Sequence, residues 1–246
     1  MGEKERQRLD KVLAHIGYGT RKEIKQIVKA GRVNVNGQVV KQADVHVWPY
    51  KDSIEVDGKQ IIYREYIYLM MNKPPGCISA TEDAVDKVVI DLLAPEHKTF
   101  EPFPVGRLDK DTEGLLLLTN DGKLAHMLLS PKKHVPKTYF AQIAGEVTEK
   151  DCEVFRNGII LDDGYRTLPS ELIVLSSGLC SEIEVTIYEG KFHQIKRMFA
   201  AVGKRVVYLK RVKMGPLKLD IQLDLGQYRE LSNEEIAALF NANKPK

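Results

Sequence analysis

A charged loop that leads directly into an apolar run constrains the fold of this chain more than any other sequence feature. The loop occupies residues 106–114, Gly-Arg-Leu-Asp-Lys-Asp-Thr-Glu-Gly, and four leucines follow at 115–118. A short apolar run of this kind predicts a buried strand. It is too short for a membrane span, which needs roughly 20 apolar residues. The carboxylate of Asp109 is therefore expected at the edge of the core, where it is costly unless a cation pairs with it or chemistry uses it.

Spacing alone leaves a second interpretation of this loop open. The dipeptide at 121–122 is Asp-Gly, a frequent turn former, and charged loops often connect buried strands without any further role. The other interpretation is that the loop carries a reactive carboxylate. On that interpretation Gly106 and Gly114 give the backbone around Asp109 the freedom that it needs.

Composition places the chain among globular proteins of one large domain or two smaller ones. Its 246 residues are 43% hydrophobic and 29% charged. Cys77, Cys152 and Cys180 form no C-x-x-C pair, which argues against a disulfide framework or a zinc site and favours a reducing compartment. The charged residues 3–8 do not resemble a secretory signal. We therefore expect a cytoplasmic protein with no membrane segment, and we expect a monomer.

Positive charge is concentrated in the first quarter of the sequence. Residues 1–62 contain 12 Lys and Arg against 8 Asp and Glu, whereas the rest of the chain contains 25 against 26. Because the net charge of the whole chain is only +3, its distribution says more than its sum. A basic front segment is what a nucleic-acid-docking module requires.

Residues 8–62 have the pattern of a compact module. Apolar spacing predicts a helix over 9–16, and Thr20 with Glu23 predicts the capping box of a second helix. Hairpins are predicted at the turn-forming dipeptides 36–37 and 57–58. The stretches R-L-D-K-V-L-A, G-T-R-K-E and V-K-A-G-R-V-N-V-N-G resemble the RNA-binding module named after ribosomal small-subunit protein S4. The resemblance implies phosphate contacts from Arg21, Lys22, Lys25 and Arg32, although solvation alone also explains such a basic face.

Residues 106–122 resemble the catalytic signature of the pseudouridine synthases, in the branch that modifies single uridines of ribosomal RNA. The resemblance rests on the pattern G-R-L-D-x-x-T-x-G-L-L-L-L-T-x-D-G. It implies that Asp109 is the catalytic aspartate and that Arg107 contacts RNA or organises the loop. Asp111 and Glu113 are spectators on this interpretation.

A second part of the same signature lies at Lys137-Thr138-Tyr139. A tyrosine at this point is by default a half-buried strand residue. In the resembling family an aromatic residue at this position lies over the target base, which implies that Tyr139 stacks on uracil with roughly 1–3 kcal/mol. Lys137 is expected to contact phosphate.

The third part is the segment 189–199, Glu-Gly-Lys-Phe-His-Gln-Ile-Lys-Arg-Met-Phe, whose apolar spacing predicts a helix. It resembles the closing motif of the synthases, in which a basic residue pairs with the catalytic aspartate. Alignment assigns that role to Lys196. Most synthases carry arginine at this position, and lysine cannot form the two parallel hydrogen bonds that arginine makes with a carboxylate. Arg197 is the competing assignment. Further RNA contacts are expected from Lys191, His193, Gln194 and Arg197.

These features predict an α+β protein with a small N-terminal RNA-binding module and a pseudouridine synthase domain, whose mainly antiparallel mixed sheet is flanked by helices. The expected boundaries are 1–62 for the module, 63–66 for a linker and 67–246 for the catalytic domain. Within that domain a helix is expected over 85–93. A final helix, capped by Ser232 and Glu235, is expected to point Ile236, Leu239 and Phe240 inward.

The resemblance implies an RNA pseudouridine synthase that isomerises one uridine, with 16S small-subunit ribosomal RNA as the favoured substrate. Asp109, kept ionised by Lys196, is expected to act as nucleophile or base. The isomerisation needs no metal or organic cofactor, and the sequence contains no G-x-G-x-x-G or G-x-x-x-x-G-K-[ST] loop.

Three other functions stay open at this stage. The first is a synthase for large-subunit 23S ribosomal RNA, and the second is a non-catalytic RNA-binding factor for ribosome assembly. The third is a glycoside hydrolase, which also acts at an anomeric carbon. That class usually needs two carboxylates in set roles and leaves the basic module unexplained.

Overall fold

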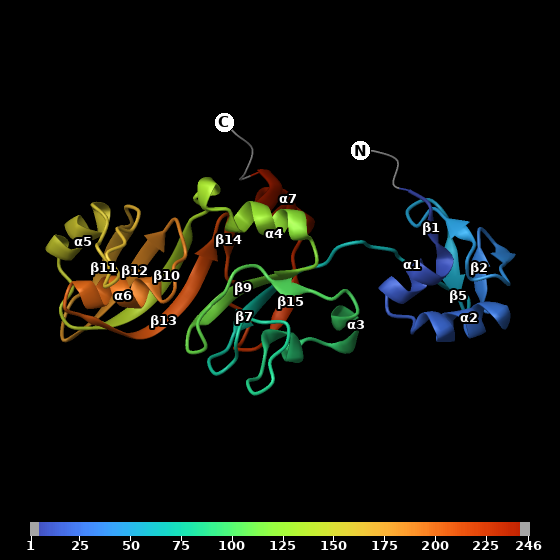
Figure 1. Ribbon diagram of the computed structural model, residues 1–246, viewed down its shortest axis with the longest axis horizontal. Helices are drawn as coiled ribbons and strands as arrows, with labels where there is room; N and C mark the ends of the chain where they lie inside the picture. The colour runs from blue at the N-terminus through green and yellow to red at the C-terminus, as the bar shows by residue number, and fades with distance from the viewer. Residues whose placement is uncertain (1–4, 242–246) are drawn as a thin grey trace. The chain divides into compact units, whose positions relative to one another are not determined.

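The computed structural model describes residues 5–241, so the outer ends of the two expected domains, 1–4 and 242–246, lie outside the described residues. The chain divides into two compact units. One comprises the chain up to Ile67 together with Ala94–Glu101, and the other comprises Tyr68–Leu93 and the chain from Pro102 onward. Figure 1 colours both units by residue number.

The smaller unit combines helices with short strands. Its helices are α1 (Leu9–His15), α2 (Arg21–Lys29) and α3 (Pro95–Lys98). Its strands are β1 (Gln7–Arg8), β2 (Val33–Val35), β3 (Gln38–Val39), β4 (His46–Val47), β5 (Ile54–Val56) and β6 (Lys59–Gln60). Its core contains buried apolar residues of α1 and α2, including Leu9, Leu13, Ile24 and Val28.

Both local predictions for this unit are confirmed. The Thr20 side chain accepts a hydrogen bond from the Glu23 backbone at 3.3 Å, and the Glu23 carboxylate accepts one from the Thr20 backbone at 2.7 Å. The two hairpins form at Asn36 and Asp57, each in the left-handed region and each followed by a glycine, which suits a two-residue hairpin turn.

Segment 94–101 joins the smaller unit through an aromatic contact that the sequence did not predict. The ring of Phe100 lies 5.1 Å from the ring of His15, edge to face. The guanidinium carbon of Arg64 lies 5.1 Å from the centre of the same ring. Phe100 is buried between these two groups and so extends the core of the smaller unit.

The larger unit is built on one sheet. Along its main path the strand order is β11 (Glu171–Ser176), β12 (Cys180–Ile187), β10 (Lys137–Ala144), β13 (Arg205–Met214), β9 (Glu113–Thr119), β7 (Tyr68–Lys73) and β15 (Tyr228–Glu230). Two short strands, β8 (Phe103–Pro104) and β14 (Leu217–Lys218), pair with β9 and β13. Within residues 5–241 every pairing in this sheet is antiparallel except that of β13 with β9, so the expected mixed sheet is confirmed.

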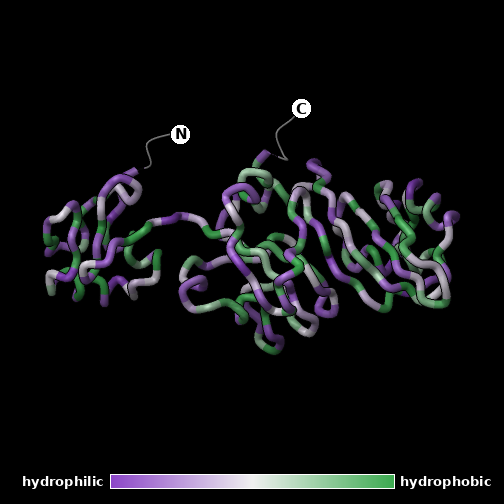
Figure 2. Tube along the Cα trace, turned by 180° about the vertical axis from the view of Figure 1, so that it is seen from behind, coloured by the Kyte–Doolittle hydropathy of each residue, from purple (hydrophilic) through white to green (hydrophobic). Residues whose placement is uncertain are grey.

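The helices flank this sheet, as Figure 1 shows. They are α4 (Gly122–Leu129), α5 (Glu149–Arg156), α6 (Gln194–Ala201), α7 (Asn233–Asn241) and the short 3-10 helices η1 (Val89–Leu92) and η2 (Pro131–Lys133). In Figure 2, hydrophobic stretches in green alternate with hydrophilic stretches in purple along the trace of both units. In the described part of the chain, no helix has the length and apolar character needed to cross a membrane.

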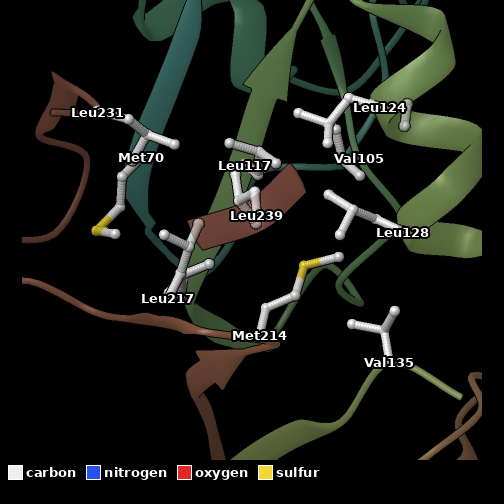
Figure 3. Close-up of a cluster of buried hydrophobic side chains, with 12 residues drawn as sticks. Met70, Val105, Leu117, Leu124, Leu128, Val135, Met214, Leu217, Leu231 and Leu239 are labelled. Carbon is white, nitrogen blue, oxygen red and sulfur yellow. The ribbon is translucent and has the colours of Figure 1, made fainter. Parts of the chain in front are cut away.

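The four leucines after the charged loop form the centre of the core. All four lie on β9 and are fully buried. Leu115 and Leu117 pack in one cluster with residues of α4, α7 and neighbouring strands, as Figure 3 shows for Leu117, Leu128 and Leu239. Strand side chains alternate in direction, so Leu116 and Leu118 are buried on the opposite face. The start of β9 is therefore held rigidly from both sides.

Gly114 is required at the point where β9 meets β13. Its φ is +100°, and an added Cβ atom would lie 2.3 Å from the carbonyl oxygen of Arg211, which is closer than atoms can approach. The parallel register joins Gly114 to Arg211. Any other residue here would push β13 away from the loop that carries Asp109.

Two predictions about the larger unit are wrong. The expected helix over 85–93 is absent apart from η1, because the Asp83 carboxylate accepts hydrogen bonds from the backbone of Val85 and Asp86 and holds a turn. Val88 then extends to bridge Ile78. On α7, Leu239 is buried and Ile236 is partly buried against the core, but Phe240 is exposed.

Candidate active site

Asp109 and Lys196 lie together although 86 residues separate them in sequence. Asp109 lies in the loop before β9, and Lys196 lies in the first turn of α6. The Lys196 Nζ atom is 3.1 Å from Asp109 Oδ2. Both side chains are about three-quarters buried, which strengthens the attraction between them relative to that of a fully exposed pair.

Asp111 shares the same ammonium group. Its Oδ1 atom lies 2.6 Å from Lys196 Nζ, closer than the oxygen of Asp109. One lysine therefore bridges two carboxylates, and the interpretation of Asp111 as a spectator of the chemistry stays a prediction. Glu113, the other expected spectator, accepts a hydrogen bond from the Tyr208 hydroxyl at 2.7 Å.

The charges of this cluster favour the ionised forms. Burial lowers the pKa of Lys196, but hydrogen bonds to Asp111 and Asp109 outweigh burial and raise that pKa above its usual value. The hydrogen bond from Lys196 holds the pKa of Asp111 below its usual range. Lys196 is therefore a cation at neutral pH, positioned to stabilise a carboxylate at Asp109.

Tyr139 forms the wall of a small cavity opposite this ion pair. The cavity has a volume of about 70 Å³, and Asp109, Lys196, Thr112 and Leu209 also line it. Only 7% of the Tyr139 surface is exposed. A cavity of about 830 Å³ shares the walls formed by Asp109 and Tyr139. The arrangement offers a flat apolar ring beside a carboxylate, which suits a planar ligand whose reacting atom faces Asp109.

His193 borders the carboxylate on its other side. Its Nε2 atom lies 3.8 Å from Asp109 Oδ1. The His193 backbone has a φ of +47°, an uncommon conformation for a residue with a Cβ atom. The ring of Phe192 stacks on the His193 ring with centroids 3.8 Å apart, while Phe192 itself is exposed.

Two buried side chains that sequence reasoning did not assign to the site hold the Asp109 loop in place. The Lys73 Nζ atom donates hydrogen bonds to backbone oxygens of Asp109 at 3.1 Å and Thr112 at 3.0 Å, and it also reaches Pro74 and Lys110. The Ser79 hydroxyl donates to the Leu108 carbonyl at 3.0 Å and accepts from the Leu108 N–H at 3.1 Å. For Lys73, the sequence signal was the turn Asn72-Lys73-Pro74-Pro75-Gly76 after a buried strand, which resembles the opening of the synthase domain but gave this lysine no role.

Glu189 organises the turn that leads into α6. Its carboxylate accepts hydrogen bonds from the Tyr165 hydroxyl at 2.6 Å, the Leu168 N–H at 2.9 Å and the Gln194 amide at 3.0 Å. The Gln194 oxygen in turn accepts from the Lys191 N–H at 2.9 Å. Gln194 is 4% exposed, and its amide is used within the protein. These bonds fix the start of the helix that carries Lys196.

Comparison with known proteins decides the family. Residues 67–201 match the family model described as RNA pseudouridylate synthase, and residues 7–47 match the S4 domain model. The chain belongs to the RNA pseudouridine synthase family. The range 67–201 contains every residue that lines either of the two cavities, apart from Leu209 and Arg211 on β13.

Relatives of this synthase resemble it over nearly its whole length. An uncharacterised RNA pseudouridine synthase of Bacillus subtilis is 52% identical, with 97% of this chain and 99% of the relative covered. Ribosomal small subunit pseudouridine synthase A of Vibrio cholerae is 39% identical, with coverages of 95% and 99%. Ribosomal large subunit pseudouridine synthase B of B. subtilis is 40% identical, with 95% of each chain covered. A crystal structure of a pseudouridylate synthase superimposes with a TM-score of 0.67 at 36% identity, covering 94% of this chain and 99% of that one.

The competing partner for Asp109 has other partners in the synthase structure. Arg197 forms ion pairs with Asp162 and with Asp163, the latter at 2.7 Å. Within residues 5–241, the cations that pair with Asp109 are Lys196 and, if protonated, His193. Lys196 therefore occupies the place that the resemblance assigned to the basic partner.

The remaining residues predicted to contact RNA near the synthase cavities fall at their walls. Arg107 and Lys191 are exposed and line both cavities. Lys191 also lies over the Tyr165 ring at 4.4 Å. Lys137 lines the larger cavity, and its Nζ atom donates to the Val135 carbonyl at 3.1 Å.

In the smaller unit Arg21, Lys22 and Lys25 are exposed on α2. Arg32 differs from them because its guanidinium group holds the Asp57 carboxylate through two hydrogen bonds of 2.7 and 2.6 Å. A phosphate contact by Arg32 must therefore compete with Asp57. Among residues 5–241, no group of three or more His, Cys, Asp and Glu side chains is arranged to hold a metal ion.

Proposed function

We propose that this synthase isomerises one uridine of 16S small-subunit ribosomal RNA to pseudouridine, acting in the cytoplasm as a monomer. The S4-type unit supplies backbone contacts through Arg21, Lys22 and Lys25, and the larger unit supplies the chemistry. The observation that carries the proposal is the Asp109–Lys196 pair, 3.1 Å apart, at a cavity that Tyr139 also lines. Full-length similarity to a small-subunit synthase of V. cholerae supports the substrate.

The reaction suits this geometry because it moves one bond and changes no oxidation state. The bond from the ribose anomeric carbon to ring nitrogen one breaks, and a bond from the same carbon to ring carbon five forms. The proton on carbon five is lost, and nitrogen one gains a proton. The target uridine must leave its stack to reach the buried carboxylate. Tyr139 then stacks on the uracil face, and Asp109 acts as nucleophile or base.

Lys196 has two tasks in this proposal. Its ammonium group lies 3.1 Å from the Asp109 carboxylate and offers it a counter-charge while an uncharged base enters the cavity and displaces water. It also orients the carboxylate, because Asp109 Oδ2 faces Lys196 and Oδ1 faces His193. Lys73 and Ser79 hold the loop backbone, which limits the movement of Asp109 as the RNA enters.

A second substrate has a specific observation in its favour. The similarity to large subunit synthase B of B. subtilis, at 40% identity, is as strong as that to the small-subunit enzyme. We therefore retain 23S ribosomal RNA as the alternative substrate. Sequence identity alone does not separate the two.

Mapping pseudouridine at single-nucleotide resolution tests the proposal. Ribosomal RNA from cells with and without the gene is compared, and purified protein is incubated with unmodified 16S and 23S RNA. The proposal predicts one pseudouridine in 16S RNA that depends on the protein in both assays. A protein-dependent site in 23S RNA selects the alternative. RNA binding with no new pseudouridine in either RNA identifies a non-catalytic assembly factor instead.

A further inference from the structure

Arg211 lies inside the larger unit in a position that the mechanism above does not use. It is on β13, directly opposite Tyr139 of β10, and it lines the cavity of about 830 Å³. Only 1% of its surface is exposed. A guanidinium group is always charged, and burying it is costly unless all its donors and its charge are matched.

The donors of Arg211 are only partly matched within the protein. Its Nε atom donates to the Leu115 carbonyl oxygen at 2.7 Å. Its Nη2 atom is buried and has no hydrogen-bond partner. Within residues 5–241, no carboxylate forms an ion pair with this arginine. The group is therefore held by β9 and retains the N–H donors of Nη2 and its full charge for a ligand.

A second cation lines the same cavity. Lys137 lies two residues before Tyr139, and its Nζ atom donates a hydrogen bond to the neutral Val135 carbonyl oxygen. Burial, and then the charge of Arg211, lower the pKa of Lys137 to about 8, whereas Glu189 raises it. The Glu189 carboxylate, however, already accepts three hydrogen bonds from other residues. The two cations repel each other, and an anion between them relieves that repulsion.

We infer that Arg211 and Lys137 form a binding site for a phosphate group of the target nucleotide. The inference rests on the proposed function, since it takes the occupant of the Tyr139 cavity to be a nucleotide. Uridine itself is uncharged at neutral pH. Its flanking phosphates are therefore the anions that a flipped nucleotide brings into the cavity. Arginine suits this task because its planar donors match phosphate oxygens, and Lys137 adds a point charge.

The site has a distinct role from the surface cations. Exposed lysines and arginines bind any phosphate along the RNA and lose affinity steeply as salt increases. A buried arginine can reach only the phosphate next to a nucleotide that has left its stack. Binding at Arg211 therefore fixes the position of the ribose relative to Asp109.

Small probes test this site without any turnover. Binding of uridine and of uridine 3′,5′-bisphosphate is measured by NMR titration of the wild-type protein, with the Arg211 Nε–H signal observed directly. We expect the bisphosphate to bind at least about tenfold more tightly, as two charge-assisted contacts allow. We also expect the Arg211 signal to shift with the bisphosphate and to stay in place with uridine.

Three variants complete the test. Arg211→Gln and Lys137→Gln should each reduce the preference for the bisphosphate, by about threefold or more. Arg205→Gln is the matched control, because Arg205 is exposed on the same strand and does not line the cavity. If Arg211→Gln does not fold, the Arg211 signal in the wild type and the Lys137→Gln result decide the question.

Equal binding of the two probes, or an unmoved Arg211 signal, overturns the inference. A shift caused equally by uridine assigns Arg211 to a uracil carbonyl oxygen and overturns it too. Failure of the proposed function is seen separately, in the ribosomal RNA mapping. A bisphosphate preference without pseudouridine formation supports the phosphate site and contradicts the proposed reaction. Pseudouridine formation without that preference supports the reaction and contradicts the phosphate site.

Discussion

The ammonium group of Lys73 lies 3.1 Å from the backbone carbonyl oxygen of Asp109. Lys73 is fully buried and pairs with no carboxylate side chain in the described part of the chain. Its hydrogen bonds go to four backbone oxygens at the end of β7 and in the loop before β9. The proposed catalytic carboxylate is therefore positioned by a lysine that touches its backbone and leaves its side chain free to react.

Replacing Lys73 with methionine should loosen the loop and destabilise the larger unit. The change leaves buried carbonyl oxygens without donors, so we expect a loss of about 2–4 kcal/mol in the free energy of unfolding. Turnover should fall more than RNA affinity, since the loop moves but the basic surface is unchanged. Urea unfolding and single-turnover kinetics measure the two effects. Lys150→Met on the exposed face of α5 is the control, and equal behaviour of the two variants contradicts the role of Lys73.

The pH dependence of stability reports on Lys73 directly. Burial lowers its pKa to about 8, from an ordinary value of 10.5. Between these two pH values the unfolded chain holds a proton that the folded chain has lost, so stability rises with pH. The contribution is at most about 1.4 kcal/mol per pH unit.

The difference in unfolding free energy between wild type and Lys73→Met should therefore widen as pH increases from 8 to 10. Below pH 8 it should be constant, because both states then hold the proton. Urea unfolding at a series of pH values, followed by circular dichroism, measures this difference. A gap that narrows over the same range means that the folded pKa of Lys73 is not lowered.

Asp111→Asn should have a mild effect on catalysis, although Asp111 lies closer to Lys196 than Asp109 does. Asp111 is largely exposed, and its carboxylate competes for the ammonium group that Asp109 requires. Removing that charge leaves Lys196 to Asp109 alone, so kcat/KM should change by less than about tenfold. Steady-state kinetics on the mapped RNA measure this change. A loss as large as that of an Asp109 variant makes Asp111 part of the catalytic machinery.

Lys196→Met should reduce turnover by about 100-fold or more, because Asp109 then loses the cation that stabilises its charge. Lys196→Arg should restore part of the activity, since it returns the charge with different geometry. Arg197→Met is the neighbouring control and should cost less than about tenfold, because Arg197 pairs with Asp162 and Asp163. A larger loss in the Arg197 variant reverses the assignment.

Local sequence signals predicted those elements that local interactions form. The capping box at Thr20 and Glu23, the two hairpin turns and the buried leucines of β9 depend on neighbouring residues, and all are confirmed. The predicted helix over 85–93 is wrong because another local interaction prevents it. The Asp83 carboxylate accepts hydrogen bonds from the backbone of Val85 and Asp86, and apolar spacing does not reveal these bonds.

The site could be predicted only in part, because its residues are brought together by the sheet. Asp109, Tyr139 and Lys196 were found through family resemblance and not through spacing. Lys73 and Arg211 were missed as site residues, since a lysine or arginine in a sequence reads as surface charge until its burial is known. The contact of Lys196 with both Asp109 and Asp111 was likewise not predicted, because it depends on the path of the loop before β9.

In the proposed mechanism the carboxylate of Asp109 performs the isomerisation. Asp109→Asn tests this role, because it keeps the side-chain volume and removes the charge. Release of tritium from carbon five of labelled uridine in ribosomal RNA, followed under single-turnover conditions, reports the bond exchange itself. We predict undetectable release by Asp109→Asn with RNA affinity unchanged, while Asp111→Asn remains active. Tritium release by Asp109→Asn at a rate near that of the wild type contradicts a catalytic role of this carboxylate.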